Sequence, residues 1–217
     1  MNALPLARRA VLALDKTRGA DFLAPLFFRL FLAPVFISAG LTKLLAFEST
    51  VAWFGNPDWG LGLPFPWLLA ALATYTELIG GFLLFFGFAT RLIAMPLMFT
   101  MIVAIMTVHW EHGWFAIAPS DPATSMAQPL AALGIPAAEE SLANSEEVGK
   151  RLTAAREILR EHGNYSWLTQ TGTFVVLNNG IEFAATYLLM LLSLFFTGPG
   201  RFLSIDYWLR RRLMPQP

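Results

Sequence analysis

The sequence predicts an all-α membrane protein: a four-transmembrane-helix bundle with an extra amphipathic helix in the loop between the third and fourth spans. Hydrophobic residues make up 56% of the 217 residues, and the mean hydropathy is +0.55. Charged residues make up 14%, whereas a soluble domain has roughly 25%. Because a soluble domain of this length could not bury so much apolar surface, the composition favours a lipid environment.

Four apolar runs are long enough to cross a bilayer. A helix needs roughly 20 apolar residues to span about 30 Å of hydrocarbon. The predicted spans cover residues 22–47, 66–88, 92–110 and 174–197. Tryptophans near several ends of these runs are typical of interfacial anchors. We expect one membrane domain over residues 1–217, with a loop at 111–173 and a tail at 198–217.

The positions of Lys and Arg predict the orientation. Positive charges occur before the first run, in the short turn after the second and in the tail, whereas the loop at 48–65 has none. By the positive-inside rule, both termini and the turn at Arg91 face the cytoplasm. The long 111–173 segment also carries Lys and Arg, but long loops are translocated largely regardless of charge.

The sequence of the long loop, residues 111–173, predicts two parts of different structure. Residues 119–138 are rich in Pro, Ala and Ser and are expected to be irregular. Residues 146–162 have apolar positions at helical spacing, with Ser145 as the expected N-cap and Gly163 as the stop. One interpretation is a helix on the extracytoplasmic surface of the bundle or bilayer. The other is a lid, or a docking site for a membrane or periplasmic protein through residues 139–162.

Ionisable residues within the apolar runs are the candidate functional residues. A charge at the bilayer centre costs about 2.5–3.5 kcal/mol on insertion scales, so each one needs a partner or a cavity. We predict a polar pocket open to the outer side, with Lys43 paired to Glu77 or Glu182. The alternative is an ion pair that only fixes helix packing. The predicted pocket residues are Arg29, Lys43, Glu77, His109, Asn178 and Glu182.

Arg29 and the glycines of the second run have competing interpretations. Arg29 either extends toward cytoplasmic headgroups or pairs with another helix, or it binds an anionic or quinone-like ligand. Gly80, Gly81 and Gly87 favour close helix packing.

Several kinds of chemistry are disfavoured. The chain has no Cys and a net charge of zero, which excludes thiol catalysis and makes nucleic acid an unfavourable partner. Met95, Met98 and Met101 have a spacing that suits Cu(I), and His109 and His112 lie three apart. Methionine more often fills gaps or faces lipid, so copper is disfavoured. We expect no metal site and no catalytic residue, and the cofactor stays unknown.

Four pieces of sequence, in register, resemble one known family. They are Arg29-Leu30 with Ser38-Ala39-Gly40-Leu41-Thr42-Lys43-Leu44, then Glu77-Leu78-Ile79-Gly80-Gly81 with Gly87-Phe88-Ala89-Thr90-Arg91, then Gly180-Ile181-Glu182-Phe183, and Gly198-Pro199-Gly200-Arg201 with Ser204-Ile205-Asp206. This pattern is similar to the DoxX family of small four-helix membrane proteins. The 111–173 insertion departs from it.

The resemblance implies a four-helix bundle in a bacterial inner membrane. Members have been linked to quinone-dependent thiosulfate oxidation, to membrane-associated redox complexes and to maturation of copper-binding peptides. The family's Arg, Lys and Glu positions correspond to Arg29, Lys43, Glu77, Arg91 and Glu182. The leading hypothesis is a redox-accessory protein that binds a quinone or other lipid-like ligand. A non-catalytic subunit of a larger membrane complex is the alternative, and a small-solute transporter ranks last because four helices are few for alternating access.

Overall fold

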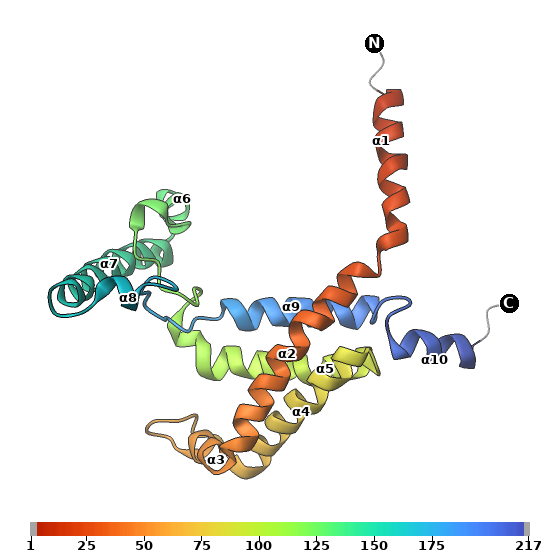
Figure 1. The fold of residues 1–217 in the computed structure, drawn as a ribbon, viewed down its shortest axis with the longest axis horizontal. Coiled ribbons are helices and arrows are strands. Elements are labelled where there is room, and N and C mark those ends of the chain that lie inside the picture. Colours follow the sequence, from red (N-terminus) through yellow and green to blue (C-terminus); the bar gives the residue numbers. More distant parts are fainter. Residues whose placement is uncertain (1–3, 215–217) are drawn as a thin grey trace. The chain divides into compact units, whose positions relative to one another are not determined.

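The computed structural model describes residues 4–214, and the regular elements over these residues are helices (Figure 1). Two compact units divide the chain. The first comprises Met1–Val108 and Ala184–Pro217, and the second comprises His109–Phe183. The first unit contains α1 (Leu4–Lys16), α2 (Leu23–Leu45), α3 (Phe47–Gly55), α4 (Pro66–Phe86), α5 (Thr90–Ala104), most of α9 (Glu182–Thr197) and α10 (Ile205–Leu213).

Three helices in the described part of the chain are long and apolar enough to cross a membrane. They are Leu23–Leu45, Pro66–Phe86 and Thr90–His112. The third comprises α5, a π-helical segment at Ile105–His109 and a 3-10 turn at Trp110–His112. These helices correspond to the first three predicted spans. The short turn between the second and third spans lies at residues 87–89, as expected.

The fourth apolar run is helical over only part of its length. Residues 174–181 are not helical, and α9 begins at Glu182. The 16 residues of α9 extend about 24 Å, which is shorter than the roughly 30 Å of hydrocarbon. The predicted start of the fourth helix at residue 174 was therefore wrong, because the helix begins at Glu182. A fourth membrane span stays a prediction.

Backbone pairing explains why residues 174–181 are extended. Ala118 N donates to Val176 O (2.9 Å), and Asn178 N donates to Ala116 O (2.9 Å). An isolated antiparallel bridge joins Ile117 and Leu177. This pairing satisfies backbone groups that a helix would otherwise satisfy internally. Hydropathy alone does not distinguish the two conformations.

Helices α2 and α4 run antiparallel and lie side by side (Figure 1). Their contact is close because it includes glycines. A Cβ on Gly40 would lie 2.7 Å from Leu78 N, and one on Gly81 would lie 2.7 Å from Ile37 Cγ1. A Cβ on Gly80 would meet the Leu97 side chain of α5 at 3.0 Å. The packing role that the sequence favoured is therefore confirmed for Gly80 and Gly81, whereas Gly87 lies in the turn after α4.

Gly40→Ala is expected to lower the unfolding free energy by about 1–3 kcal/mol, because backbone atoms of Leu78 would have to move. Thermal unfolding in detergent, followed by circular dichroism, measures this loss. Gly19→Ala is the matched control, since a Cβ there would meet nothing within 4 Å. Equal stability of the two variants would contradict the close-packing argument.

The hydrophobic core of the first unit joins α2, α4, α5 and α9. Met101 is part of this core and Met98 packs against it. Met98 and Met101 therefore fill gaps between helices, which is an ordinary use of a flexible thioether, whereas Met95 is exposed. The buried core residues are Leu32, Ala33, Phe36, Leu84, Ala94, Leu97, Met101, Ala184, Leu191 and Leu194.

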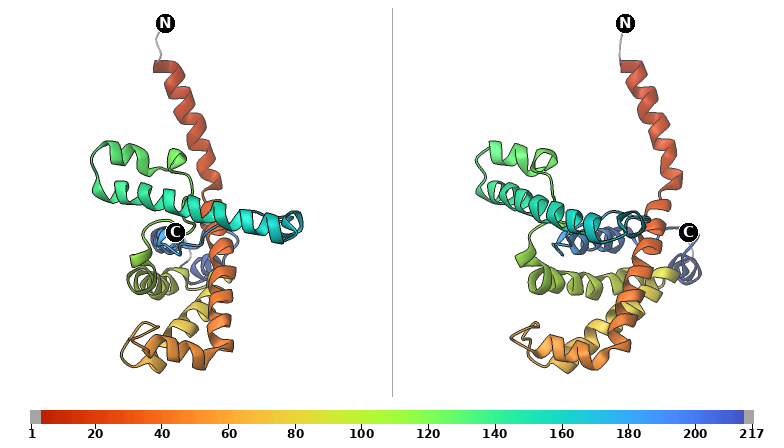
Figure 2. Two further views of the ribbon diagram at one scale, coloured as in Figure 1. Left: turned by 90° about the vertical axis from the view of Figure 1, so that its left-hand side faces the viewer. Right: turned by 60° about the vertical axis from the view of Figure 1, so that its left-hand side comes forward.

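The second unit is built around a long helix. It contains α6 (Ala127–Ala132), α7 (Pro136–His162) and α8 (Tyr165–Leu168), and α6 lies alongside α7 (Figure 2). The expectation that 119–138 is irregular was wrong, because α6 and the start of α7 fall within it. Pro136 at the first helical position sets the start of α7 ten residues earlier than predicted.

Of the two ends predicted for the loop helix, the start at Ser145 was wrong and the stop at Gly163 is confirmed. Ser145 is not an N-cap: it is buried inside α7, and its hydroxyl donates to Ser141 O at 2.8 Å. Gly163 follows the last residue of α7, as expected. The helix itself is present, whereas its position on a membrane or bundle surface stays a prediction.

Candidate functional site

Lys43 and Glu77 form a largely buried ion pair on facing helices. Lys43 is in the last turn of α2, and Glu77 is near the middle of α4. The distance from Lys43 Nζ to Glu77 Oε2 is 2.6 Å. The Glu77 side chain is 8% exposed and that of Lys43 is 25% exposed. The structure thus contains the first of the two pairings that the sequence suggested for Lys43.

The pair leaves hydrogen-bonding capacity unused. Within residues 4–214, Glu77 Oε2 is the acceptor recorded for the Lys43 ammonium. An ammonium has three N–H donors, so two remain for other acceptors. Lys43 is also the more exposed member of the pair. A ligand with acceptor oxygens that approached α2 and α4 would meet these donors beside a buried carboxylate.

Arg29 lies at the opposite end of α2 from Lys43, about 21 Å away along the helix axis. Its side chain is buried. Nη1 donates to the carbonyls of Leu84 (3.2 Å) and Phe85 (3.3 Å), and Nη2 donates to Leu203 O (2.7 Å). The last carbonyls of a helix have no intrahelical donor, so Arg29 supplies one for α4. This geometry supports helix pairing for Arg29 and not extension toward headgroups.

The turn between α4 and α5 is shaped around this arginine. Gly87 has a φ of 62°, and a Cβ there would collide with Arg29 Nη1. Gly87 N donates to Leu84 O and Phe88 N to Leu83 O, which is a Schellman ending for α4. Gly87 is therefore required both by its backbone conformation and by its contact with Arg29.

Asp206, from α10, caps the start of α5. Its two carboxylate oxygens accept from Ala89 N (2.7 Å) and Thr90 N (2.9 Å). A carboxylate at a helix N-terminus is stabilised by the free N–H groups and by the helix dipole. Arg91, in the first turn of α5, donates from Nε to Phe195 O at 2.8 Å. The tail thus binds to the α4–α5 turn through named polar contacts.

The remaining predicted residues lie in the second unit and bind backbone groups. His109 Nδ1 and Asn179 O are 2.7 Å apart. Asn178 Nδ2 donates to Phe115 O at 3.0 Å. Glu182 Oε2 accepts from Ala116 N at 3.0 Å. These contacts brace the pairing of residues 113–118 with 176–182.

The residues predicted for one pocket therefore have different surroundings. Lys43 and Glu77 are together, Arg29 is at the far end of α2, and His109, Asn178 and Glu182 belong to the second unit. A pocket lined by all six stays a prediction. Helix pairing was one of the interpretations that the sequence offered for Arg29, but its acceptors could not be identified, because main-chain carbonyls carry no sequence signal.

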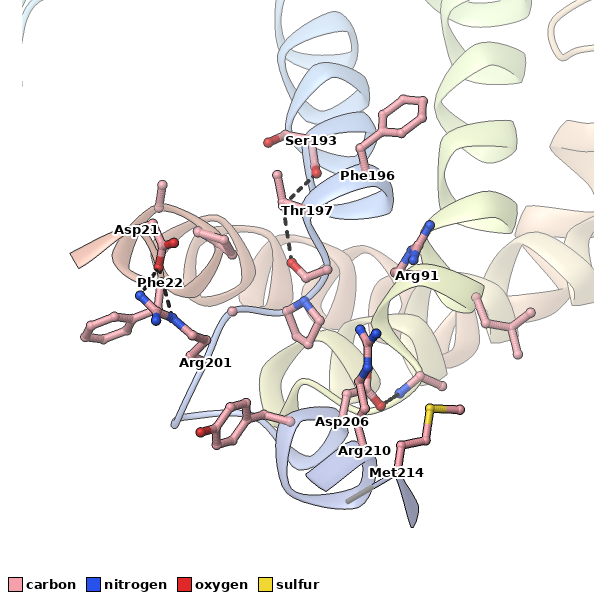
Figure 3. Close-up of a pocket in the computed structure, with 18 of the residues that line it drawn as sticks. Asp21, Phe22, Arg91, Ser193, Phe196, Thr197, Arg201, Asp206, Arg210 and Met214 are labelled. Carbon is pink, nitrogen blue, oxygen red and sulfur yellow. Dashed lines mark hydrogen bonds and ion pairs between the residues drawn. The ribbon is translucent and has the colours of Figure 1, made fainter. Parts of the chain in front are cut away.

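A cavity of about 950 Å³ occupies the Arg91 end of the first unit (Figure 3). It is lined by the start of α2, the start of α5, the end of α9 and α10. The tail arginines entered the sequence prediction through the orientation of the chain and, for Arg201, through the family resemblance, and neither predicted this cavity. The signal that could have indicated it was the prediction that the tail arginines and the Arg91 turn lie on the same side of the membrane.

Comparisons with known proteins cover part of the chain. Residues 24–110 match the model of the DoxX family, which confirms the resemblance for the part from α2 to the end of the third apolar helix. The protein of Bacillus subtilis (strain 168) named "Putative oxidoreductase CatD" is 38% identical over 87 residues. That alignment spans 40% of this chain and 60% of the relative's length. No solved structure matches the chain.

Proposed function

We propose, with the DoxX match over residues 24–110 as the premise, that this chain is a multi-pass protein of the bacterial cytoplasmic membrane that assists a membrane redox process. The ligand is a quinone or another lipid-soluble molecule with acceptor oxygens, bound beside Lys43 and Glu77. Both residues lie within the matched segment. A relative named as an oxidoreductase supports a redox role.

The single observation that carries this proposal is the Lys43–Glu77 pair. Taking two charges out of water costs several kcal/mol per ion, and their mutual attraction often fails to repay that cost. Hydrophobic residues in the same place would often hold two helices together as well. A charged pair with unused donors and an exposed edge therefore supports a role in binding, in addition to packing.

The residues present suit a quinone head group. A bound quinone would supply a two-electron, two-proton acceptor. Lys43 would donate a hydrogen bond to a carbonyl oxygen, and Glu77 would hold or release a proton beside it. The chain has no Cys, and none of its side chains is a resident electron carrier. The electrons would therefore come from a partner protein.

The proposed orientation follows from charge. The turn at Arg91 and the tail arginines lie at one end of α4 and α5, and positive residues concentrate on the cytoplasmic side of membrane proteins. We therefore place both termini in the cytoplasm and Lys43 toward the outer side, with α9 as the fourth span.

A non-catalytic scaffold is the second candidate, and the second unit favours it. This unit, His109–Phe183, lies almost wholly beyond the DoxX match. Its described surface includes exposed apolar side chains, among them Ile158 within residues 139–162. Such side chains suit contact with a membrane or periplasmic protein through residues 139–162.

The experiment that tests the quinone proposal is extraction of ligands from the purified protein. We expect wild-type protein in mild detergent to retain a quinone that mass spectrometry detects, and Glu77→Gln and Lys43→Gln to lose most of it. Glu48→Gln is the matched control, because Glu48 is an exposed carboxylate on α3.

Two outcomes would contradict the quinone proposal. One is wild-type protein with no more quinone than an unrelated membrane protein prepared in the same way. The other is unchanged quinone content in Glu77→Gln. A co-purifying protein that is lost on deletion of 139–162, with no quinone present in either preparation, would favour the scaffold instead.

A further inference from the structure

We propose that the cavity between Arg91 and Arg210 binds the phosphate group of an anionic phospholipid. The cavity lies wholly within the first unit and holds about 950 Å³. Figure 3 shows Arg91 and Arg210 on the same side of it, from α5 and α10, and Arg201 on the other side beside Asp21.

Three charged groups around the cavity already have protein partners: Arg201, Asp21 and Asp206. Arg201 donates to Asp21 Oδ1 from Nη2 (2.6 Å) and Nε (3.1 Å). Asp206 accepts from two backbone N–H groups at the start of α5 and also attracts the buried Arg29. Within residues 4–214, neither Asp21 nor Asp206 forms an ion pair with Arg91 or Arg210, and the one ion pair beside the cavity is Arg201–Asp21.

Within residues 4–214, Arg91 and Arg210 keep guanidinium donors that make no hydrogen bond to a protein acceptor. Arg91 uses Nε for Phe195 O, and no bond within residues 4–214 is recorded for its two terminal nitrogens. No side-chain bond of Arg210 is recorded over the same residues. Because guanidinium groups match the oxygens of a phosphate, these two arginines form a cationic site that suits an anion of this geometry.

The apolar lining of the cavity favours a lipid over a small soluble anion. Phe196 of α9, Leu92 of α5 and Leu213 of α10 line it and are exposed. Leu92 lies on a helix that is long and apolar enough to cross a membrane, and Phe196 lies on the shorter apolar helix α9. A ligand with an anionic head and an acyl chain would satisfy the arginines and cover the apolar side chains together.

The location agrees with this assignment. The cavity lies at the positively charged end of the helices, where anionic lipids of the cytoplasmic leaflet attract Lys and Arg. It is at the opposite end of α2 from Lys43. The lipid site is therefore independent of the proposed quinone site, and each proposal can fail alone.

Native mass spectrometry of the full chain in neutral detergent tests the proposal, with phosphatidylglycerol and phosphatidylcholine as probes. We expect wild-type protein to retain phosphatidylglycerol at lower concentration than phosphatidylcholine. Arg210→Gln is expected to weaken phosphatidylglycerol binding about tenfold. Arg210→Gln is the main variant, because the Arg210 side chain makes no hydrogen bond or ion pair within residues 4–214 that the substitution would remove. Arg91→Gln is the second variant.

Arg212→Gln is the matched control. It removes the same charge from the same helix, but Arg212 is not part of the cavity lining. If Arg212→Gln weakened phosphatidylglycerol binding as much as Arg210→Gln, the proposal would be overturned, because general positive charge on the surface would explain the binding. Equal retention of the two lipids would overturn it in favour of a merely apolar groove. Stabilisation against heat by inorganic phosphate as large as that by phosphatidylglycerol would replace the lipid with a soluble anion.

Discussion

Arg29→Leu is expected to destabilise the protein by about 3–5 kcal/mol. The change removes a buried guanidinium that donates to Leu84 O, Phe85 O and Leu203 O. Phe85 O and Leu203 O lose that donor, whereas Leu84 O still accepts from Gly87 N. Hydrogen bonds to charged groups contribute about 1.5–3 kcal/mol each, and a buried group left unsatisfied costs about 1–3 kcal/mol. Thermal unfolding in detergent measures the loss as a lower midpoint temperature.

The same variant is also expected to release the tail. Leu203 O connects Arg29 to the segment before α10, so limited proteolysis should cut residues 198–214 faster in Arg29→Leu than in wild type. Arg29→Lys is the graded control, because it keeps the charge but cannot reach three separate carbonyls with a planar fork. A midpoint for Arg29→Leu within about 2 °C of wild type would show that Arg29 does not join these segments.

Hydropathy correctly predicted the long helices that are apolar along their whole length. The three long apolar helices match the first three predicted spans within a few residues, because every residue in such a helix contributes to the signal. The Lys43–Glu77 pairing was also within reach of sequence reasoning. A lysine near the end of one apolar run and a glutamate near the middle of another have few other ways to be compensated.

The parts that sequence reasoning missed depend on contacts with main-chain atoms. Asn178 and Glu182 bind the backbone of Phe115 and Ala116, and a hydrogen bond to a carbonyl or an amide sets no requirement on the partner's side chain. The start of α7 was missed for a different reason. Pro136 is a helix-start signal, but the Pro- and Ala-rich composition around it favoured an irregular segment.

Removing one member of the Lys43–Glu77 pair is expected to cost more than removing both. Lys43→Met leaves the carboxylate of Glu77, which is 8% exposed, without its cation, at a cost of about 3–5 kcal/mol. Glu77→Leu should cost less, about 1–3 kcal/mol, because the more exposed lysine can extend toward the interface. The unfolding free energy of the double variant Lys43→Met with Glu77→Leu should lie within about 1 kcal/mol of the wild-type value.

The double variant also separates packing from binding. If the pair served only to hold α2 against α4, the double variant would be stable and would keep whatever quinone the wild type retains. If the charges bind the ligand, the same variant would be stable and empty, because Met and Leu offer a carbonyl oxygen no N–H donor. Thermal unfolding and quinone extraction from one preparation therefore distinguish the two roles. A double variant as unstable as Lys43→Met would contradict the electrostatic account of the pair itself.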